Sequence, residues 1–235
     1  MHKLNATLVG VAALVVVAAG ATPCLAAATT DDAKRLNEST TVLAEMRNAP
    51  DIPDTVWQKA ECVVVIPSLK KAGFILGGEF GSGVMSCRRA NTWGAPVFMK
   101  LTKGSAGFQI GVQSTDLVLM VMNRRGVEKL LSNKVTLGAD ASVAAGPVGR
   151  HASASTDAQM TAEMLSYSRS KGFFAGIDLS GGSLRPDDSA NARMYGQTSA
   201  RAIALSTTPV VMTTEARAFT NALGSGVRAT TGTKK

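Results

Sequence analysis

The stretch that decides the fold runs from Glu61 to Arg89 and reads ECVVVIPSLKKAGFILGGEFGSGVMSCRR. It opens on an apolar, β-branched run, Cys62 to Ile66, which is typical of a buried strand. Pro67 and Ser68 follow directly and predict a turn that ends this strand. A second strand is expected from Ala72 to Leu76.

The second half of the stretch is rich in glycine, with glycines at 77, 78, 81 and 83. Glycines inside strands indicate bulges or close approach of backbones, and so many together predict a sharply bent hairpin. A third strand is expected from Val84 to Cys87. The stretch therefore predicts a small antiparallel sheet around which the chain is built. Two basic pairs, Lys70 with Lys71 and Arg88 with Arg89, lie at the ends of its strands.

The first 28 residues have the layout of a secretory signal peptide. A basic start is followed by an apolar run from Ala6 to Ala19 and by small residues that end in Ala26-Ala27-Ala28. Cleavage is expected after Ala26 or Ala28. An uncleaved anchor and a lipoprotein modified at Cys24 are the alternatives. The formal net charge of +8 at pH 7 suits an exported protein with anionic partners, although much of that charge can serve solubility alone.

Two cysteines remain beyond the leader, Cys62 and Cys87, and export places them in an oxidising compartment. We therefore expect a disulfide between them, with two buried free thiols as the alternative. No Cys/His cluster lies nearby in the sequence, so we expect no metal site.

Regular elements are expected along most of the remaining chain. The apolar spacing within 31–48 predicts a helix packed on the sheet, with a membrane-surface helix as the alternative. Strands are expected at 62–66, 96–101, 107–113 and 117–122, with a turn at 114–116 and a further strand at 135–146. A hairpin is expected around 170–172, and helices at 54–60, 123–131, 187–195 and 215–223, with a further turn at 199–204. Small side chains and polar residues predict that the tail, 224–235, is disordered.

Motifs of enzyme chemistry are absent from the sequence. The chain beyond the leader has one histidine, His151, and no G-x-S-x-G nucleophile elbow accompanies it. Neither a phosphate-binding P-loop nor a dinucleotide fingerprint occurs. Asp187 and Asp188 are adjacent carboxylates that fit a helix N-terminus better than a catalytic pair. We expect no enzyme, no cofactor and no catalytic residue, with a hydrolase using His151 as the remote alternative.

Four motifs in order carry a resemblance to a known family. They are IPSLKKAGFILGG at 66–78, GSAGFQIGVQSTDLVLMVMN at 104–123, LGADASVAAGPVGR at 137–150 and YSRSKGFFAGIDLSGGSL at 167–184. With them the chain resembles the SYLF lipid-binding domain family over about residues 32 to 196. The resemblance implies an α+β fold with a strongly curved, mostly antiparallel sheet or barrel-like core, and helices packed on it. It places a single domain at 29–223, between the leader 1–28 and the tail.

The resemblance also implies a lipid-binding role without catalysis. Eukaryotic relatives bind phosphoinositides and actin, whereas bacterial relatives are exported. We expect a periplasmic or secreted protein that associates with anionic phospholipid or membrane surfaces through Lys70, Lys71, Arg88 and Arg89, and no nucleic-acid partner. If the four side chains converge they form one patch, and a solvated rim is the alternative. A structural protein that binds envelope proteins through its sheet edge or the 152–159 loop is the second functional hypothesis.

Overall fold

The computed structural model describes residues 29–49, 52–73, 76–90, 92–106, 111–132, 134–147, 161–170, 173–175, 177–208 and 210–224. The predictions about the leader, His151, the 152–159 loop and residues 225–235 lie outside these ranges and stay predictions. The helices are α1 (Thr30–Asn48), α2 (Asp54–Lys59), α3 (Arg124–Ser132), α5 (Asp188–Tyr195), α6 (Ala200–Leu205) and α7 (Thr214–Gly224). The strands are β1 (Cys62–Gly73), β2 (Leu76–Arg89), β3 (Thr92–Trp93), β4 (Val97–Ala106), β5 (Gly111–Val121), β6 (Val135–Thr136), β7 (Val143–Ala145), β8 (Met164–Ser170), β9 (Phe173–Ala175) and β10 (Ser183–Pro186).

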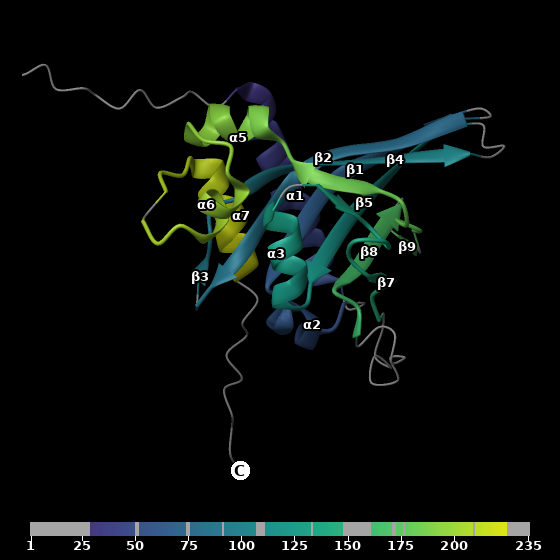
Figure 1. Ribbon diagram of the computed structural model, residues 1–235, viewed down its shortest axis with the longest axis horizontal. Helices are drawn as coiled ribbons and strands as arrows, with labels where there is room; N and C mark the ends of the chain where they lie inside the picture. Colours follow the sequence, from purple (N-terminus) through teal and green to yellow (C-terminus); the bar gives the residue numbers. More distant parts are fainter. Residues whose placement is uncertain are drawn as a thin grey trace, which may run out of the picture.

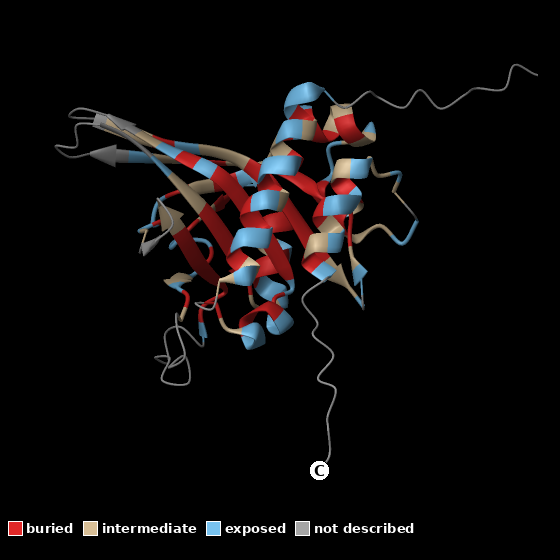
Figure 2. Cartoon of the chain, turned by 180° about the vertical axis from the view of Figure 1, so that it is seen from behind, coloured by how far each residue is buried: buried red, intermediate tan, exposed pale blue. Residues whose placement is uncertain are grey.

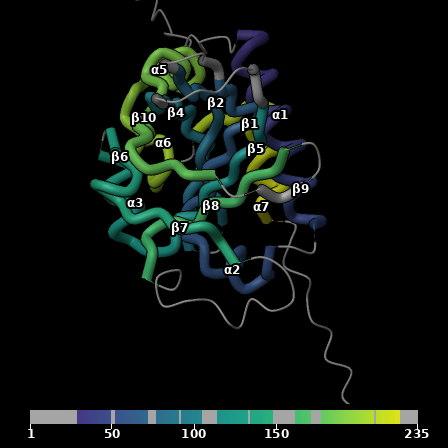
Figure 3. The backbone as a smooth tube through the Cα atoms, turned by 90° about the vertical axis from the view of Figure 1, so that its right-hand side faces the viewer, coloured from purple at the N-terminus to yellow at the C-terminus, as the bar shows by residue number. Residues whose placement is uncertain are grey.

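The strands join in one curled sheet. Their order is β6-β10-β4-β2-β1-β5-β8-β7, with β3 paired to β2 and β9 paired to β8. The described pairs of these strands are antiparallel except β7 with β8. Viewed from the side, the sheet curls into an open half-barrel, with helices on it (Figures 1 and 3). The predicted α+β class with a strongly curved, mostly antiparallel sheet is confirmed.

Both faces of the central strands are covered, which explains their continuous apolar sequences. In β1, Val63 and Val65 pack toward α1 and α7, while Cys62, Val64 and Ile66 face the core on the side of α3 and α6. β5 alternates in the same way, as its apolar run predicted. In Figure 2, α1 crosses the sheet in front of buried strand segments, and the strands emerge beyond it with intermediate and exposed residues.

The turn predicted at Pro67 and Ser68 is wrong, because β1 continues through it as a bulge. The pairing of β1 slips between Val65 and Lys70 against β2, and between Ile66 and Leu69 against β5. Ser68 adopts a left-handed φ of 54°, and its N–H donates to Asp116 Oδ1 at 3.0 Å. A bulge tolerates proline, which has no N–H for the ladder, and it bends the strand.

The glycine run does not turn the chain either. β2 begins at Leu76 and pairs with β1 and β4 through all of these glycines, so the β1–β2 connection lies at residues 74–75. A Cβ on Gly83 would lie 1.9 Å from the Val65 carbonyl oxygen, and one on Gly81 would lie 2.5 Å from Ile66 Cγ2. These two glycines therefore let β2 pass close to the β1 bulge.

Other boundaries differ locally from the prediction. β5 runs unbroken through the turn predicted at 114–116. The single strand predicted at 135–146 is two short strands, β6 and β7, separated by a tight turn in which Gly138 has φ 84°. The expected helices are present, and a short helix, α6, stands where a turn was predicted at 199–204. Asn123 begins α3, as predicted, by accepting the Gly126 N–H at 3.0 Å.

Candidate functional site: a basic groove between α1 and the sheet

The four basic residues predicted to bind lipid do not form one patch. In the β1–β2 pairing, Lys70 lies opposite Phe80, while Arg88 lies eight residues further along β2, beside the Cys62–Cys87 pair. At about 3.3 Å per residue this separates the two pairs by roughly 26 Å. The predicted convergence is therefore wrong, because β1 and β2 form one long two-stranded hairpin rather than a three-strand meander.

Lys71 and Arg88 have structural partners. The Lys71 ammonium lies 3.3 Å from Glu79, a carboxylate that is buried on the opposite face of the sheet from Phe80. Arg88 donates to the carbonyls of Ala60 and Trp57 and lies over the Trp93 ring. Arg88 therefore ties α2 to the sheet.

Arg89 is half-buried at the last position of β2. It pairs with Thr92 of β3, at the α2 end of the hairpin. Of the four predicted residues, only Lys70 lines a cavity.

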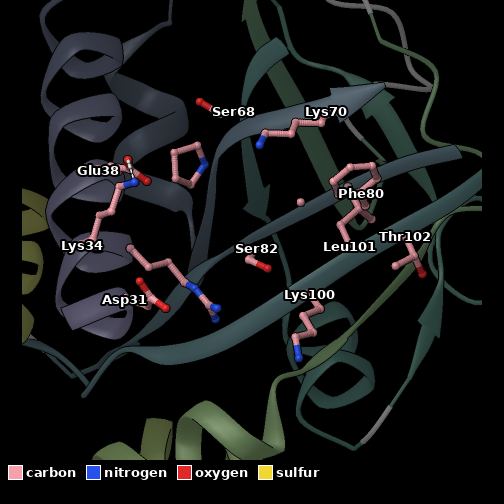
Figure 4. A pocket seen from close by; sticks show the side chains of 13 residues that line it. Asp31, Lys34, Glu38, Ser68, Lys70, Phe80, Ser82, Lys100, Leu101 and Thr102 are labelled. Atoms are coloured by element: carbon pink, nitrogen blue, oxygen red, sulfur yellow. Dashed lines mark ion pairs between the residues drawn. The ribbon is translucent and has the colours of Figure 1, made fainter. Parts of the chain in front are cut away.

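That cavity is a groove of about 500 Å³ between α1 and strands β1, β2 and β4. Figure 4 shows Asp31, Lys34 and Glu38 on the helix side and Lys70, Phe80 and Lys100 on the strand side. The Lys70 ammonium extends from β1 toward the helix. We call this cavity the α1 groove.

The sheet register explains the floor of the α1 groove. Lys70, Phe80 and Thr102 are cross-strand partners on three neighbouring strands, so their side chains share one face. Ser82 and Lys100 form the next row. Further along the same face, Val84 and Phe98 are buried with α1. The groove thus begins where the helix ceases to cover the sheet, and Phe80 is left 51% exposed there.

Basic side chains dominate the inner wall of the groove. Arg35 and Lys100 each lie 2.9 Å from the carboxylate of Asp187, whose side chain is 3% exposed. Burial on its own would raise the pKa of Asp187, but hydrogen bonds from Arg35 and Lys100 hold that pKa below its ordinary value. Asp187 also caps α5 by accepting the Ala190 N–H, which confirms its predicted place at a helix N-terminus.

The remaining charges of the groove are looser. Lys34 and Glu38 form an exposed pair at 3.8 Å, which contributes little to stability. Lys70 is exposed and has no ion-pair partner among the described residues. An unpaired ammonium beside an exposed aromatic ring and two hydroxyl groups, on Ser82 and Thr102, is suited to binding an anion with an apolar part.

The described residues offer little for other chemistry. Over the described ranges, His, Cys, Asp and Glu side chains nowhere gather in threes as a metal site would require. Each helix within those ranges is too short or too polar to cross a bilayer. His151, the one candidate for hydrolysis, lies outside them. The groove supports binding rather than bond-breaking.

The predicted cysteine pair is bonded in the structure. Cys62 and Cys87 face each other directly across β1 and β2 and form a disulfide. They are neighbours in one hairpin, rather than residues of the first and last strands of a three-strand unit. Both side chains are buried in the core on the side of α3 and α6, away from the α1 groove.

Lys34, Arg35 and Lys100 were not among the residues predicted from sequence. Lys100 carries a usable signal, because it interrupts the apolar pattern of β4: Phe98 is buried under α1, and the next residue on that face is charged. Such a change marks the point where cover ends. Lys34 and Arg35 give no comparable signal, since a basic residue beside a buried helix position is usually only solvated.

Comparison with known proteins identifies relatives. Residues 102–226 match the family model Ysc84, described as "Las17-binding protein actin regulator". SH3 domain-containing YSC84-like protein 1 of Xenopus laevis is 34% identical over 197 residues, which cover 82% of this chain and 58% of that protein. LAS seventeen-binding protein 3 of Saccharomyces cerevisiae is 35% identical over 190 residues, covering 75% of this chain and 41% of that protein. The match thus spans about half the length of these relatives.

Proposed function

Because this chain belongs to the Ysc84 family, which is the SYLF family, we propose that it is a non-catalytic binding protein whose α1 groove receives anionic lipid head groups. The observation that carries the proposal is the groove itself. It places Lys34, Arg35, Lys70 and Lys100 around an exposed phenyl ring. Anionic surfaces attract basic side chains by about 1 kcal/mol each, so several together give useful affinity.

This proposal changes the residues assigned to the site. Lys70 keeps the role predicted for it. Lys34 and Lys100 replace Arg88 and Arg89, whose end of the hairpin is packed against α2 and β3. Lys71 is engaged by Glu79 on the other face, which leaves it a secondary contributor.

The proposed location is the bacterial cell envelope, after export and removal of residues 1–28. The layout of the N-terminal residues and the basic net charge support it. N-terminal sequencing of protein recovered from the periplasm should begin after Ala26 or Ala28. A sequence beginning at Met1 in the cytoplasmic fraction would contradict export.

Vesicle flotation tests the lipid proposal. Wild-type protein should float with vesicles that contain phosphatidic acid or phosphatidylglycerol and remain behind with phosphatidylcholine alone. Binding should weaken with salt, because the Debye length falls from about 10 Å at 0.1 M to about 3 Å at 1 M. Failure to bind either anionic vesicle at low salt would refute the proposal.

A protein partner is the second candidate function. The family description names Las17 and actin, and the yeast relative is named for binding to Las17. For an exported chain such a partner would be an envelope protein. Co-sedimentation with filamentous actin separates the cases: pelleting with actin, combined with no flotation on anionic vesicles, would favour the protein-binding role over the lipid-binding one.

A further inference from the structure

The α1 groove differs from a flat basic surface in its size and its rigid inner wall. Its volume of about 500 Å³ falls within the range of about 300 to 1,000 Å³ that is usual for small-molecule sites. The buried Asp187 carboxylate fixes the Arg35 guanidinium and the Lys100 ammonium on two different elements, α1 and β4. We propose that the groove is a discrete site for one phosphomonoester amphiphile, bound by its phosphate group with its apolar segment lying across Phe80. This inference rests on the proposed lipid-binding function and specifies its ligand.

The charge inside the groove selects the head group. Arg35, Lys70 and Lys100 face a single inner carboxylate, Asp187, which leaves two positive charges uncompensated. A phosphomonoester carries about −1.5 to −2 at pH 7 and matches them, whereas a phosphodiester carries only one negative charge. Lys34 and Glu38 pair with each other at the rim and add no net charge.

The hydrogen-bonding groups favour the same ligand. Ser82 and Thr102 line the groove beside the ammonium groups, so hydroxyl and ammonium donors line one space. A phosphomonoester has three acceptor oxygens for such donors, and charge-assisted bonds of this kind are the strong ones.

Phe80 distinguishes a lipid from free phosphate. Its ring lies between Lys70 and Thr102 in the cross-strand row and is 51% exposed, although most large apolar side chains in the described part of the chain are buried. An inorganic phosphate ion would leave that ring in water. An amphiphile covers it with the first carbons beyond the head group, which removes apolar surface from water.

The test uses the full-length protein without its leader and ligands that stay monomeric in water. Isothermal titration calorimetry is run with dihexanoyl phosphatidic acid, dihexanoyl phosphatidylglycerol and inorganic phosphate. We expect one site per chain for the phosphatidic acid, with an affinity at least about fivefold above that for phosphatidylglycerol, since one charge is worth about 1 kcal/mol. Inorganic phosphate should bind at least about fivefold more weakly than the phosphatidic acid, because it cannot cover Phe80.

Three variants locate the site. Lys70→Gln and Phe80→Ser should each weaken binding of dihexanoyl phosphatidic acid by about fivefold, since each removes a contact worth about 1 kcal/mol. Lys59→Gln is the matched control, because Lys59 is exposed on α2 and away from the groove, and it should leave the affinity unchanged. Both groove residues are exposed, so the variants are expected to fold, and circular dichroism checks this.

The outcomes separate this inference from the function on which it rests. Equal affinity for the two short-chain lipids would overturn the head-group assignment. Phosphate binding as tight as that of phosphatidic acid, with no effect of Phe80→Ser, would show that soluble phosphate is the ligand and overturn the amphiphile. If no short-chain lipid binds although anionic vesicles do, the discrete site is refuted and the proposed function stands. If the vesicles do not bind either, both fail.

Discussion

Replacing Asp187 with asparagine should weaken the fold and strengthen anion binding at the same time. Asparagine caps a helix as well as aspartate does, so the start of α5 is preserved. The variant loses two ion pairs of 2.9 Å, to Arg35 and Lys100. An exposed pair contributes up to about 1 kcal/mol, and breaking a buried one costs about 3 to 5 kcal/mol.

The expected loss lies between these limits. Asp187 is 3% exposed, but the Arg35 and Lys100 side chains are 17% and 37% exposed and remain partly hydrated. We therefore expect a decrease of about 2 kcal/mol in the free energy of unfolding at pH 7. With a urea m-value of about 2 kcal/mol/M, the unfolding midpoint should fall by about 1 M. Removing one negative charge beneath the groove should also tighten binding to anionic vesicles about fivefold.

The difference in stability should depend on pH in a defined direction. The ion pairs hold the folded-state pKa of Asp187 below its unfolded value of about 3.9, so their contribution is complete above that value. It is lost as pH falls through the folded-state pKa. The gap between wild type and variant should therefore close below about pH 4, where the protonated carboxyl group is neutral like the amide.

Asp188→Asn is the matched control for this variant. Asp188 is the next residue, lies exposed in the first turn of α5 and has no ion pair among the described residues. Its replacement changes the net charge equally but should cost less than about 1 kcal/mol. An Asp187→Asn protein as stable as wild type at pH 7, or a control that loses as much, would refute the role assigned to Asp187.

Two further predictions concern the β1–β2 hairpin. Gly83→Ala should lower the free energy of unfolding by about 3 kcal/mol, because the new Cβ would meet backbone atoms of Val65 and Ile66. Gly104→Ala, whose Cβ would meet nothing within 4 Å, should change it by less than about 1 kcal/mol. Equal effects in urea unfolding would contradict the close approach at the bulge. Reducing the Cys62–Cys87 disulfide, which closes a separation of 25 residues, should cost about 3 kcal/mol, and an unchanged midpoint with dithiothreitol would contradict this.

The parts of the fold that depend on local sequence were predictable. α1 shows its 3.6-residue apolar spacing, and the run from Leu117 shows a strand buried on both faces. The path of β1 was not predictable, because Pro67 usually ends a strand and only tertiary pairing on both sides turns it into a bulge. The glycines after Leu76 gave the correct physical signal, close backbone approach, but the hairpin was expected at them rather than before them.

The candidate site shows a similar division. Successive strand residues point to opposite faces, so Lys70 and Lys71 cannot serve one surface, and this much follows from the sequence once β1 is continuous. The groove itself depends on pairing between β2 and β4 and on the place where α1 stops covering the sheet. No local pattern brings Lys34 next to Lys70, because they belong to elements that meet only in the folded chain.

Binding of a groove variant to anionic vesicles tests the central claim most directly. Lys34→Gln/Lys70→Gln removes two groove charges, whereas Lys59→Gln/Lys134→Gln removes two exposed charges elsewhere. In titrations with phosphatidic acid vesicles at 0.1 M salt, the groove variant should bind about 30-fold more weakly than wild type, since each charge contributes about 1 kcal/mol. The control should bind within about threefold of wild type. Equal weakening of the two folded variants would show that net charge, and not the α1 groove, attracts the membrane.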